Sequence, residues 1–579
     1  MFLKRIKHNS YIILFLIFLL GFIFRIYGLD WDNGHHLHPD ERFLTMVTSD
    51  IKLPHNIFEY FNTNTSPLNP FNYKSYQFFV YGTFPLFLVK YISSIFNADT
   101  YNSVYLYGRV ISALFDSTNI IILYLLSVNL IKNKKYHLLA SFIYAFAVLP
   151  IQLSHFFAVD TFLNTFLLTT FLFLVLWCQQ KKYKYFYLSA LVYGLAAATK
   201  ISSILFLPII LLFCLYFYFK IQKNYKIIFY LLGFAFIVFV IFRIFQPYAF
   251  NDFLIPNPKF ISSIQQLNEI LNNRLAFYPP EVQYLSKTPL LYPLFTLTFW
   301  GFGVPFSLAL FAALIYFILK LKSTNFFILI AAIWIIFLVV EQGLQFTNPV
   351  RYFLPAYPFM TLVIATFFAE LTKYKNVLIV LLILHSLYAL AFLNIYSRPH
   401  SRTQASFWIY QNIPDGSSIA NEYWDDPLPL SNPNSTPRNY TNTMLPLYDS
   451  DTDVKWINLN KILSQTDYLI LSSNRLWGSI PQVPYRYPLA TKYYQDLFEG
   501  RSEFKEIIEF NSYPGLSLSF FKKCLYLGPT NYPLLSFKNN WFEVDDTCNY
   551  PGIYLRDDTS EEAFTVYDHP KVVIFKKNI

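Results

Sequence analysis

Charged residues are scarce in this chain of 579 residues, where Asp, Glu, Lys and Arg together make up 14%. A soluble domain carries about 25% charged residues. The deficit is uneven, because residues 1–396 hold 28 Lys and Arg and 14 Asp and Glu, whereas residues 397–579 hold 17 and 21. An ordinary soluble enzyme is therefore excluded. We expect a polytopic α-helical membrane domain at 1–396 and a water-facing domain at 397–579.

Cysteine is also scarce, with four residues and no CxxC or Cys/His metal pattern. Cys178 and Cys214 lie in apolar runs, whereas Cys524 and Cys548 lie in the polar tail and are candidates for a disulfide outside the reducing compartment. The net charge of +10 divides into +14 for residues 1–396 and −4 for the remainder. We attribute this excess to membrane topology and expect no nucleic-acid partner.

Eleven apolar windows are long enough to cross a bilayer core of about 30 Å. The first follows the basic segment MFLKRIKH and lacks a small-residue cleavage site, so we expect a retained span. The windows are 11–29, 104–131, 136–154, 160–178, 185–199, 201–219, 227–246, 290–319, 325–341, 352–370 and 376–396.

The segment 78–96 is apolar but interrupted by Gly82, Pro85 and Lys90. If it does not cross the membrane, all the basic clusters next to the spans fall on one side, as the positive-inside rule requires. We therefore expect it to lie in the interface as a juxtamembrane helix, inside an outer loop at 30–103. The same topology places the tail and most polar residues of chemical interest on the outer face of the plasma membrane.

The tail has the pattern of a small mixed α/β domain. Residues 403–412 and 490–498 are expected to be helical. Short strands are expected at 418–422, 467–472 and 571–576, with Pro- and Asn-rich loops between them.

The segment HHLHPDERF, directly after the first span, is the sharpest polar feature of the chain. The paired acids Asp40 and Glu41 are costly at a bilayer surface unless they meet cations, a metal or a substrate. Alternatively they simply begin a helix at Pro39, because acids suit the positive end of a helix. Three nearby histidines are candidate metal ligands, but no second group of ligands is recognisable elsewhere in the sequence. We therefore assign no metal-binding residues, and the question of a divalent metal stays open. The three histidines are His35, His36 and His38.

A second group of polar residues lies at the predicted ends of the spans. Asp160 follows His155 at the outer end of one span and is either a helix-start charge or a site residue. Three cations, Arg109, Lys200 and Arg351, have two interpretations. They snorkel to the interface, or they neutralise a phosphate.

Five segments together resemble the polyprenyl-phosphate-sugar-dependent glycosyltransferases, and most closely glycosyltransferase family 39. This family includes the protein O-mannosyltransferases and the aminoarabinose transferases of lipid A, which share the GT-C membrane fold. The resemblance covers roughly residues 10–400. The segments are HPDERF at 38–43, GRVISALFDSTNIIILYLLSVNLI at 108–131, HFFAVDTFL at 155–163, GLAAATKISSILFLP at 194–208 and RYFLPAYPF at 351–359.

The resemblance implies an inverting transfer from a sugar linked to polyprenyl phosphate. It implies that Asp40 is the catalytic base, that Glu41 orients the acceptor or a cation, and that Asp160 holds hydroxyls of the donor sugar. Lys200 and Arg351 would stabilise the departing phosphate. Two further residues are assigned a lesser part at the donor site: His155 and Arg109.

The tail segments EYWDDPLPL at 422–430 and AFTVYDHPKVVIF at 563–575 depart from the mannosyltransferase and aminoarabinose transferase tails. The acceptor, whether protein, lipid or glycan, therefore stays open. A transporter or flippase of lipid-linked sugars is an alternative, which needs paired charges near the middle of the membrane; the main candidates are Asp116 and Arg243. A third hypothesis is a non-catalytic membrane anchor, for which the acids on the outer face are dispensable.

Overall fold

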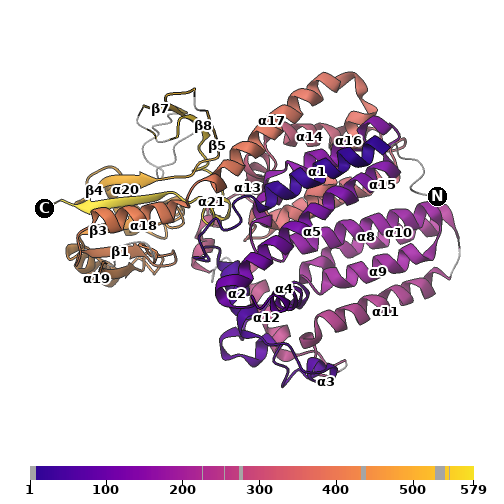
Figure 1. Ribbon diagram of the computed structural model, residues 1–579, viewed down its shortest axis with the longest axis horizontal. Coiled ribbons are helices and arrows are strands. Elements are labelled where there is room, and N and C mark those ends of the chain that lie inside the picture. The colour runs from indigo at the N-terminus through magenta and orange to yellow at the C-terminus, as the bar shows by residue number, and fades with distance from the viewer. Residues whose placement is uncertain are drawn as a thin grey trace.

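The computed structural model describes residues 8–223, 226–252, 254–272, 278–431, 438–518, 520–528, 541–546, 548 and 550–578. A bundle of long helices fills one part of the molecule, and two β-sheets extend from it (Figure 1). The five-stranded sheet lies at one end of the longest axis and the helical bundle at the other (Figure 1). This arrangement confirms the predicted fold class of a helical membrane protein with a C-terminal mixed α/β domain.

Among the described residues, seven helices are long and apolar enough to cross a membrane, or eight if one bent pair counts as a span. Helices also occupy the other predicted windows but are shorter, so the number of eleven spans stays a prediction. The helices that correspond to the windows are α1 (His8–Ile26), α5 (Tyr101–Leu130), α6 (Leu139–Ala145), α7 (Val148–Ser154), α8 (Asp160–Gln180), α9 (Tyr183–Ala197), α10 (Leu207–Tyr216), α11 (Ile227–Phe245), α13 (Leu291–Thr296), α14 (Val304–Leu319), α15 (Phe326–Leu344), α16 (Tyr357–Glu370) and α17 (Lys375–Leu393).

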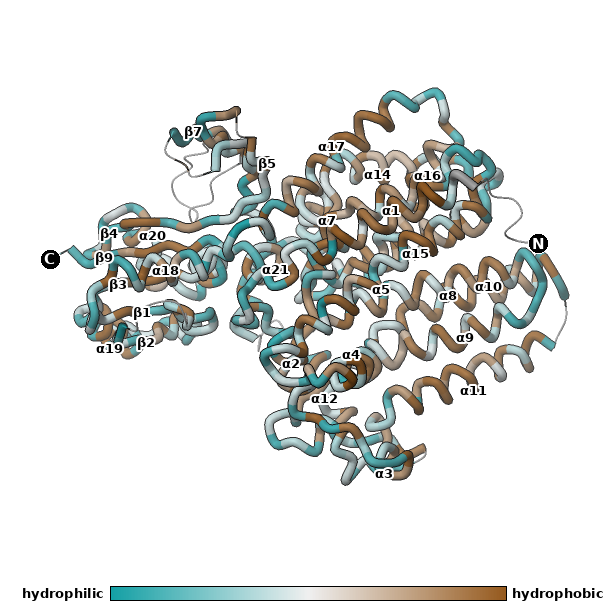
Figure 2. Tube along the Cα trace, in the orientation of Figure 1, coloured by the Kyte–Doolittle hydropathy of each residue, from teal (hydrophilic) through white to brown (hydrophobic). Residues whose placement is uncertain are grey.

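The helices differ in how much of their surface other helices cover. In the most apolar window of α8, 89% of the residues are buried, whereas in that of α11 only 11% are buried. The side chains of α11 that remain exposed are large and apolar, Phe229 and Phe236 among them. Helix α8 therefore lies in the centre of the bundle, whereas α11, whose residues are largely hydrophobic (brown in Figure 2), is suited to contact lipid.

The loop between the first two long helices contains α2 (Pro39–Asp50), α3 (Ile57–Phe61) and α4 (Thr83–Ile95). Figure 1 shows α4 nearly end-on while α5 and α8 run across the view. A Cβ atom on Gly82, just before α4, would lie 2.1 Å from the carbonyl oxygen of Ala198, so only glycine allows this approach. The amide of Gly82 donates to the carbonyl of Thr199 at 2.9 Å, which ties the loop to the backbone next to Lys200.

The C-terminal domain is built on a five-stranded sheet in the order β2–β1–β3–β9–β4. The pairs β1–β2 and β1–β3 are parallel, and β9 runs antiparallel to β3 and β4. The predicted strands and the two predicted helices of the tail are confirmed. The elements are α18 (Ser401–Asn412), β1 (Ser418–Glu422), β2 (Thr441–Leu445), α19 (Asp453–Ser464), β3 (Tyr468–Leu471), α20 (Pro488–Phe498), β4 (Phe504–Phe510) and β9 (Val572–Lys577).

Strand β9 explains why the sheet has helices on both faces. Successive side chains of a strand point to opposite faces, and Val572 and Ile574 pack with residues of α18. Val573 and Phe575 pack with residues of α19 and α20 on the other face. The continuous apolar run VVIF is therefore buried on both sides, in the middle layer of three.

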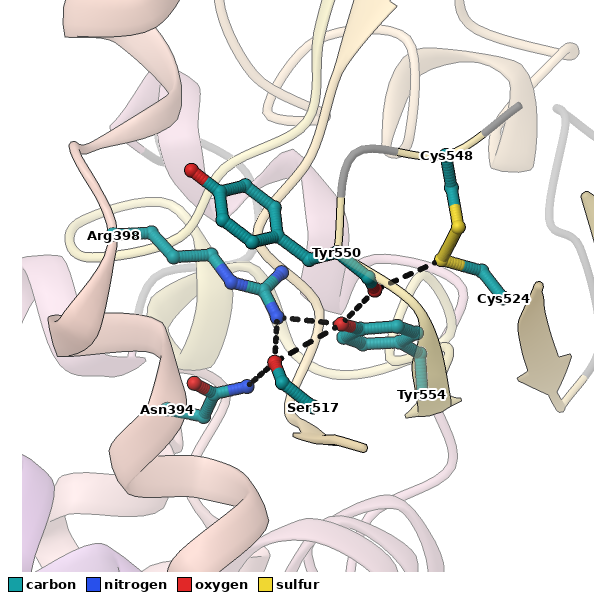
Figure 3. The surroundings of a disulfide bond; sticks show 7 residues. All are labelled: Asn394, Arg398, Ser517, Cys524, Cys548, Tyr550 and Tyr554. Carbon is teal, nitrogen blue, oxygen red and sulfur yellow. Dashed lines mark hydrogen bonds between the residues drawn. A yellow bond between two sulfur atoms is a disulfide. The ribbon is translucent and has the colours of Figure 1, made fainter. Parts of the chain in front are cut away.

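A second sheet has the order β5 (Gly515–Ser517), β8 (Gly552–Leu555), β6 (Cys524–Leu527) and β7 (Phe542–Asp545). The disulfide Cys524–Cys548 links the first residue of β6 to the segment between β7 and β8 (Figure 3). This disulfide confirms the predicted pairing. Arg398, which follows α17, donates hydrogen bonds to Ser517 Oγ at 3.0 Å and to the Tyr554 hydroxyl at 2.7 Å (Figure 3). The end of the helical bundle thus contacts this sheet directly.

The last part of the tail packs back into the helical bundle. Asp568 accepts hydrogen bonds from Gln152 of α7 at 3.0 Å and from the hydroxyl of Tyr396 at 2.7 Å. His569 lies between the carboxylates of Asp568 and Asp557, at 2.5 and 2.8 Å. Burial alone would lower the pKa of His569, but the two carboxylates raise it to about 10, so the imidazole is charged. The division at residue 396 stays a prediction, since side chains on both of its sides form one buried network.

Candidate active site

Helix α2 begins where the acidic pair lies. Pro39 occupies its first turn, and the ring Nδ1 of His38 accepts the amide hydrogen bond of Glu41 at 3.2 Å. Asp40 and Glu41 therefore stand at the positive end of a helix, which favours their charge. A helix thus begins at Pro39, as expected, and the two acidic side chains point in different directions.

Asp40 forms an ion pair with Arg351, whose guanidinium donates to Asp40 Oδ2. Arg351 lies in a 3-10 turn, η10 (Val350–Ala356), which leads into α16. Burial alone would raise the pKa of Asp40, but the charge and hydrogen bond of Arg351 outweigh it and lower the pKa to about 2. Both side chains keep some contact with solvent, being 24% and 20% exposed. The carboxylate is therefore ionised and accessible.

A second ion pair lies beside the first. Lys200 Nζ is 2.8 Å from Asp160 Oδ1, at the points where α8 begins and α9 has just ended. The ring of Tyr352 connects the two pairs: its centroid is 4.6 Å from Lys200 Nζ and 5.7 Å from the guanidinium carbon of Arg351. The structure thus brings together four of the residues predicted from the sequence.

Two tyrosines that the sequence analysis did not identify also border this site. Tyr81, in the segment before α4, forms a hydrogen bond with Asp40, and burial together with the Asp40 charge raises the pKa of the Tyr81 hydroxyl well above its usual value. Tyr567 comes from the C-terminal domain, and its ring centroid lies 4.3 Å from that of His38. The tail therefore contributes directly to the surroundings of Asp40.

Glu41 points away from Asp40 into a closed cluster. Its carboxylate pairs with Arg109 of α5, with Nε–Oε1 at 3.0 Å, and it accepts the amide of Phe157 at 2.7 Å. Asp32 contacts the same guanidinium at 3.0 Å. The side chains of Glu41, Arg109 and Asp32 have no exposed surface. The structure therefore does not place Glu41 and Arg109 beside Lys200 and Arg351.

His155 is likewise enclosed. Its ring nitrogens lie 2.8 Å from the carbonyl oxygen of Ile151 and 2.9 Å from that of Tyr27, and its ring stacks on Tyr396 with centroids 3.8 Å apart. It is fully buried. This geometry makes His155 a packing residue behind the site, which the structure does not bring into contact with Asp40.

The histidines before α2 pack against aromatic rings. His36 lies between Tyr101 and Tyr105, with centroid distances of 4.2 and 4.8 Å. Burial lowers the pKa of both His36 and His38 to about 4, so both are neutral near pH 7. Within the part of the chain that the structure describes, no group of three or more His, Cys, Asp or Glu side chains could hold a metal ion.

A buried ion pair lies within the bundle, away from Asp40. Asp116 of α5 pairs with Arg25 of α1 at 2.7 Å, and neither side chain has exposed surface. Asp116 also accepts a hydrogen bond from the Tyr144 hydroxyl at 2.5 Å, and Asn164 is directed to the same carboxylate. The sequence analysis named Asp116 but missed Arg25, which lies in the first apolar window. The pair is satisfied internally and holds α1 against α5.

Residues 84–245 match the family model described as dolichyl-phosphate-mannose-protein mannosyltransferase. This segment includes Asp160 and Lys200, whereas Asp40 and Arg351 lie on either side of it. The match confirms the resemblance that the motifs indicate and supports a glycosyltransferase. A comparison with curated proteins finds no match.

Three solved structures show a distant likeness. The oligosaccharyltransferase of Archaeoglobus fulgidus in complex with Zn and sulfate has 16% identity and a TM-score of 0.48, covering 83% of this chain and 70% of that chain. AglB of the same organism with an inhibitory peptide and a dolichol-phosphate has 14% identity and a TM-score of 0.47, covering 84% and 72%. ArnT of Cupriavidus metallidurans bound to undecaprenyl phosphate has 13% identity and a TM-score of 0.44, covering 70% and 72%.

Proposed function

We propose that this protein transfers a sugar from a polyprenyl phosphate to an acceptor hydroxyl at the outer face of the plasma membrane, with inversion at the anomeric carbon. The observation that carries the proposal is the pairing of Asp40 with Arg351 beside the pair Asp160–Lys200. Such a transfer needs a base for the hydroxyl proton and positive charge for the leaving phosphate. One partly open site offers both.

The position of the two cations fits a donor with a lipid tail. Lys200 directly precedes the 3-10 turn η5 (Ile201–Phe206), and Arg351 lies in η10; each turn leads into an apolar helix. A phosphate at the membrane surface can reach both cations while its tail stays among the helices. Arg offers a planar fork for phosphate oxygens, and Lys offers a point charge.

Binding of the phosphate would change the basicity of Asp40. Arg351 holds the pKa of Asp40 at about 2, which makes the carboxylate a weak base while the pair is intact. A phosphate that competes for Arg351 weakens this pair, so the pKa of Asp40 rises and its affinity for a proton increases. The donor thereby prepares the base that its own transfer requires.

In the reaction, the acceptor oxygen attacks the anomeric carbon and its proton passes to Asp40. The bond between the anomeric carbon and the phosphate oxygen breaks, and the electron pair stays on the phosphate. Arg351 and Lys200 stabilise this charge. Asp160, released from Lys200, accepts hydrogen bonds from the hydroxyls of the donor sugar. Attack opposite the leaving group inverts the configuration.

The buried residues Glu41, Arg109 and His155 have positioning roles in this proposal. The Glu41–Arg109 pair fixes the first turn of α2 against α5 and so fixes the direction of Asp40. No step is assigned to a divalent metal, because the carboxylates of Asp40 and Asp160 each already have a cationic side chain as partner. The transporter alternative gains no support from Asp116, which pairs with Arg25 in a closed network.

The test is a transfer assay with the purified full-length protein in lipid. Radiolabelled polyprenyl-phosphate hexoses and pentoses are offered with a cell-envelope extract, and the matching nucleotide sugars serve as the control donors. We expect release of polyprenyl phosphate and a labelled product whose anomeric configuration, read by NMR, is opposite to that of the donor. Consumption of nucleotide sugars without a lipid carrier, or retention of configuration, would contradict the proposal.

A further inference from the structure

A pocket lies between α2 and the C-terminal domain, next to Asp40. Its walls include Pro39 and Arg42 of α2, Trp424 and Asp426 of the loop after β1, and Tyr567. Pro39 immediately precedes Asp40, and the Tyr567 ring packs on His38, the residue that caps α2. The pocket therefore lies against the first turn of α2, which carries Asp40, on the side of the C-terminal domain.

The pocket is separate from the residues that would hold the donor phosphate. Lys200 and Arg351 belong to turns that lead into spans, whereas the walls of this pocket come from the outer loop and the tail. An inverting displacement needs the acceptor and the leaving group on opposite sides of the anomeric carbon. With the phosphate on the membrane side of Asp40, the acceptor approaches from the side of the tail.

The charges around the pocket are balanced. Asp426 bridges two guanidiniums, with Arg42 Nη2 at 2.7 Å and Arg402 Nη1 at 2.8 Å. Arg402 also pairs with Asp425 at 2.5 Å. A third guanidinium, that of Arg475, pairs with Glu562 at 2.6 Å. The walls thus carry three guanidiniums and two carboxylates, and Arg475 finds its partner in Glu562, outside the walls. Every cation of the pocket is therefore already paired, which disfavours an anionic ligand.

Trp424 presents an aromatic side chain under an unusual backbone constraint. Its φ is +83°, in the left-handed region that favours glycine. Its carbonyl accepts a hydrogen bond from Arg475 Nη1 at 2.6 Å, and its ring meets that of Tyr278 edge-on at 5.0 Å. The side chain is only half-buried. Strained backbone conformations of this kind are enriched at active sites and ligand-binding sites.

We propose that this pocket binds a neutral polyhydroxylated acceptor, the sugar unit of a glycan, and presents one of its hydroxyls to Asp40. The flat, apolar face of a sugar ring suits Trp424, and its hydroxyls suit the bridged carboxylate of Asp426 and the guanidinium of Arg42. An anionic polymer or a phosphorylated lipid would need unpaired cations. The inference rests on the proposed function and names its acceptor class.

The experiment uses the full-length protein in lipid, with two separate readouts. Release of polyprenyl phosphate reports donor turnover, and fractionation of the envelope extract into glycan, protein and lipid reports where the labelled sugar goes. We expect the label in the neutral glycan fraction. If the wild type releases no polyprenyl phosphate from any donor, the proposed function fails, and this inference falls with it.

Variants then test the pocket itself. Trp424→Gly removes the ring and relieves the left-handed backbone, so it is not expected to unfold the domain. We expect the concentration of the glycan fraction that half-saturates transfer to rise at least tenfold in this variant. Trp424→Phe should restore most of the acceptor affinity. The matched control is Trp541→Gly, an exposed tryptophan of the second sheet's edge, which should have no effect.

Two results would overturn the inference while leaving the proposed function intact. The first is turnover of the donor with the label in the protein or lipid fraction. The second is an equal response of Trp424→Gly and Trp541→Gly to acceptor concentration.

Discussion

Asp40 and Arg351, which are 311 residues apart in the sequence, form an ion pair at the end of the helical bundle that faces the C-terminal domain. One residue comes from the first turn of a helix outside the spans and the other from the turn before a span. The fold brings them together because the outer loop is fixed to the bundle at two points, Gly82 to Thr199 and Glu41 to Arg109. The pair is the centre of the proposed site.

The pH dependence of turnover should report this ion pair. Arg351 holds the pKa of Asp40 at about 2, against the effect of burial. In Arg351→Gln the burial remains without the cation, so the pKa of Asp40 should rise. Because the base must be ionised, the acid limb of kcat/KM should move to higher pH. Arg351→Lys, which keeps a positive charge, should shift it less. An unchanged acid limb in Arg351→Gln would show that Asp40 is not the titrating base.

Lys200 should govern the affinity for the lipid phosphate. Lys200→Gln removes a charge-assisted contact, and we expect the half-saturating donor concentration to rise on the order of tenfold. The matched control is Lys184→Gln. Lys184 is an exposed lysine in the first turn of α9, the helix that ends just before Lys200. The difference in half-saturating donor concentration between Lys200→Gln and the wild type should be smaller at high salt, because ions screen the interaction of partly exposed charges. If Lys184→Gln lost as much affinity for the donor as Lys200→Gln, a specific role of Lys200 in binding the phosphate would be contradicted.

The Glu41–Arg109 pair should matter for stability more than for chemistry. Glu41→Ala leaves the buried Arg109 with Asp32 as its remaining acidic partner, and breaking a buried pair costs about 3–5 kcal/mol. We expect a clear drop in the thermal unfolding temperature of the detergent-purified protein. Glu499→Ala, which removes an exposed pair with Arg501, should change stability by about 1 kcal/mol or less. Equal unfolding temperatures of the two variants would contradict the buried geometry.

Glu561 links the C-terminal domain to Arg351. Its carboxylate accepts the amide of Val350 at 2.7 Å and the hydroxyl of Tyr284 at 2.6 Å. Burial raises the pKa of Glu561 to about 7, so the folded protein retains this proton at a pH where the unfolded chain has lost it. Stability should therefore fall as the pH rises from about 4.5 to 7.

The variant Glu561→Gln removes this titration. Its unfolding temperature should decrease less than that of the wild type over the same pH range, measured in parallel thermal scans. Parallel pH profiles for the two proteins would show that Glu561 does not hold a raised pKa.

The sequence predicted the charged members of the site because charge is costly at a membrane surface and therefore conspicuous there. Asp40, Asp160, Lys200 and Arg351 stand out in apolar surroundings, and the structure pairs them as two ion pairs. It could not separate Glu41 from its neighbour, because a helix turns successive side chains by about 100° and only the packing of α5 decides which one is buried.

Tyr81 and Tyr567 could not be predicted, since the chain has 46 tyrosines and nothing local distinguishes these two. Their role depends on tertiary contacts. The same holds for the sheet: β3 and β9 have apolar runs and were predicted, whereas β2 is a partly exposed strand at the edge of the sheet and carries little pattern. The structure places Tyr567 of the tail next to His38, a contact between segments more than 500 residues apart that no local pattern announces.

The most direct measurement compares donor turnover by the wild type, Asp40→Asn and Asp50→Asn. Asp50 is an exposed acid at the other end of the same helix, so its variant controls for the loss of one charge from α2. A general base contributes about 10²–10⁴-fold to a rate, and we expect Asp40→Asn to lose that much kcat while the protein remains folded. Asp50→Asn should keep its activity. A folded Asp40→Asn protein that transfers sugar at the wild-type rate would contradict the account.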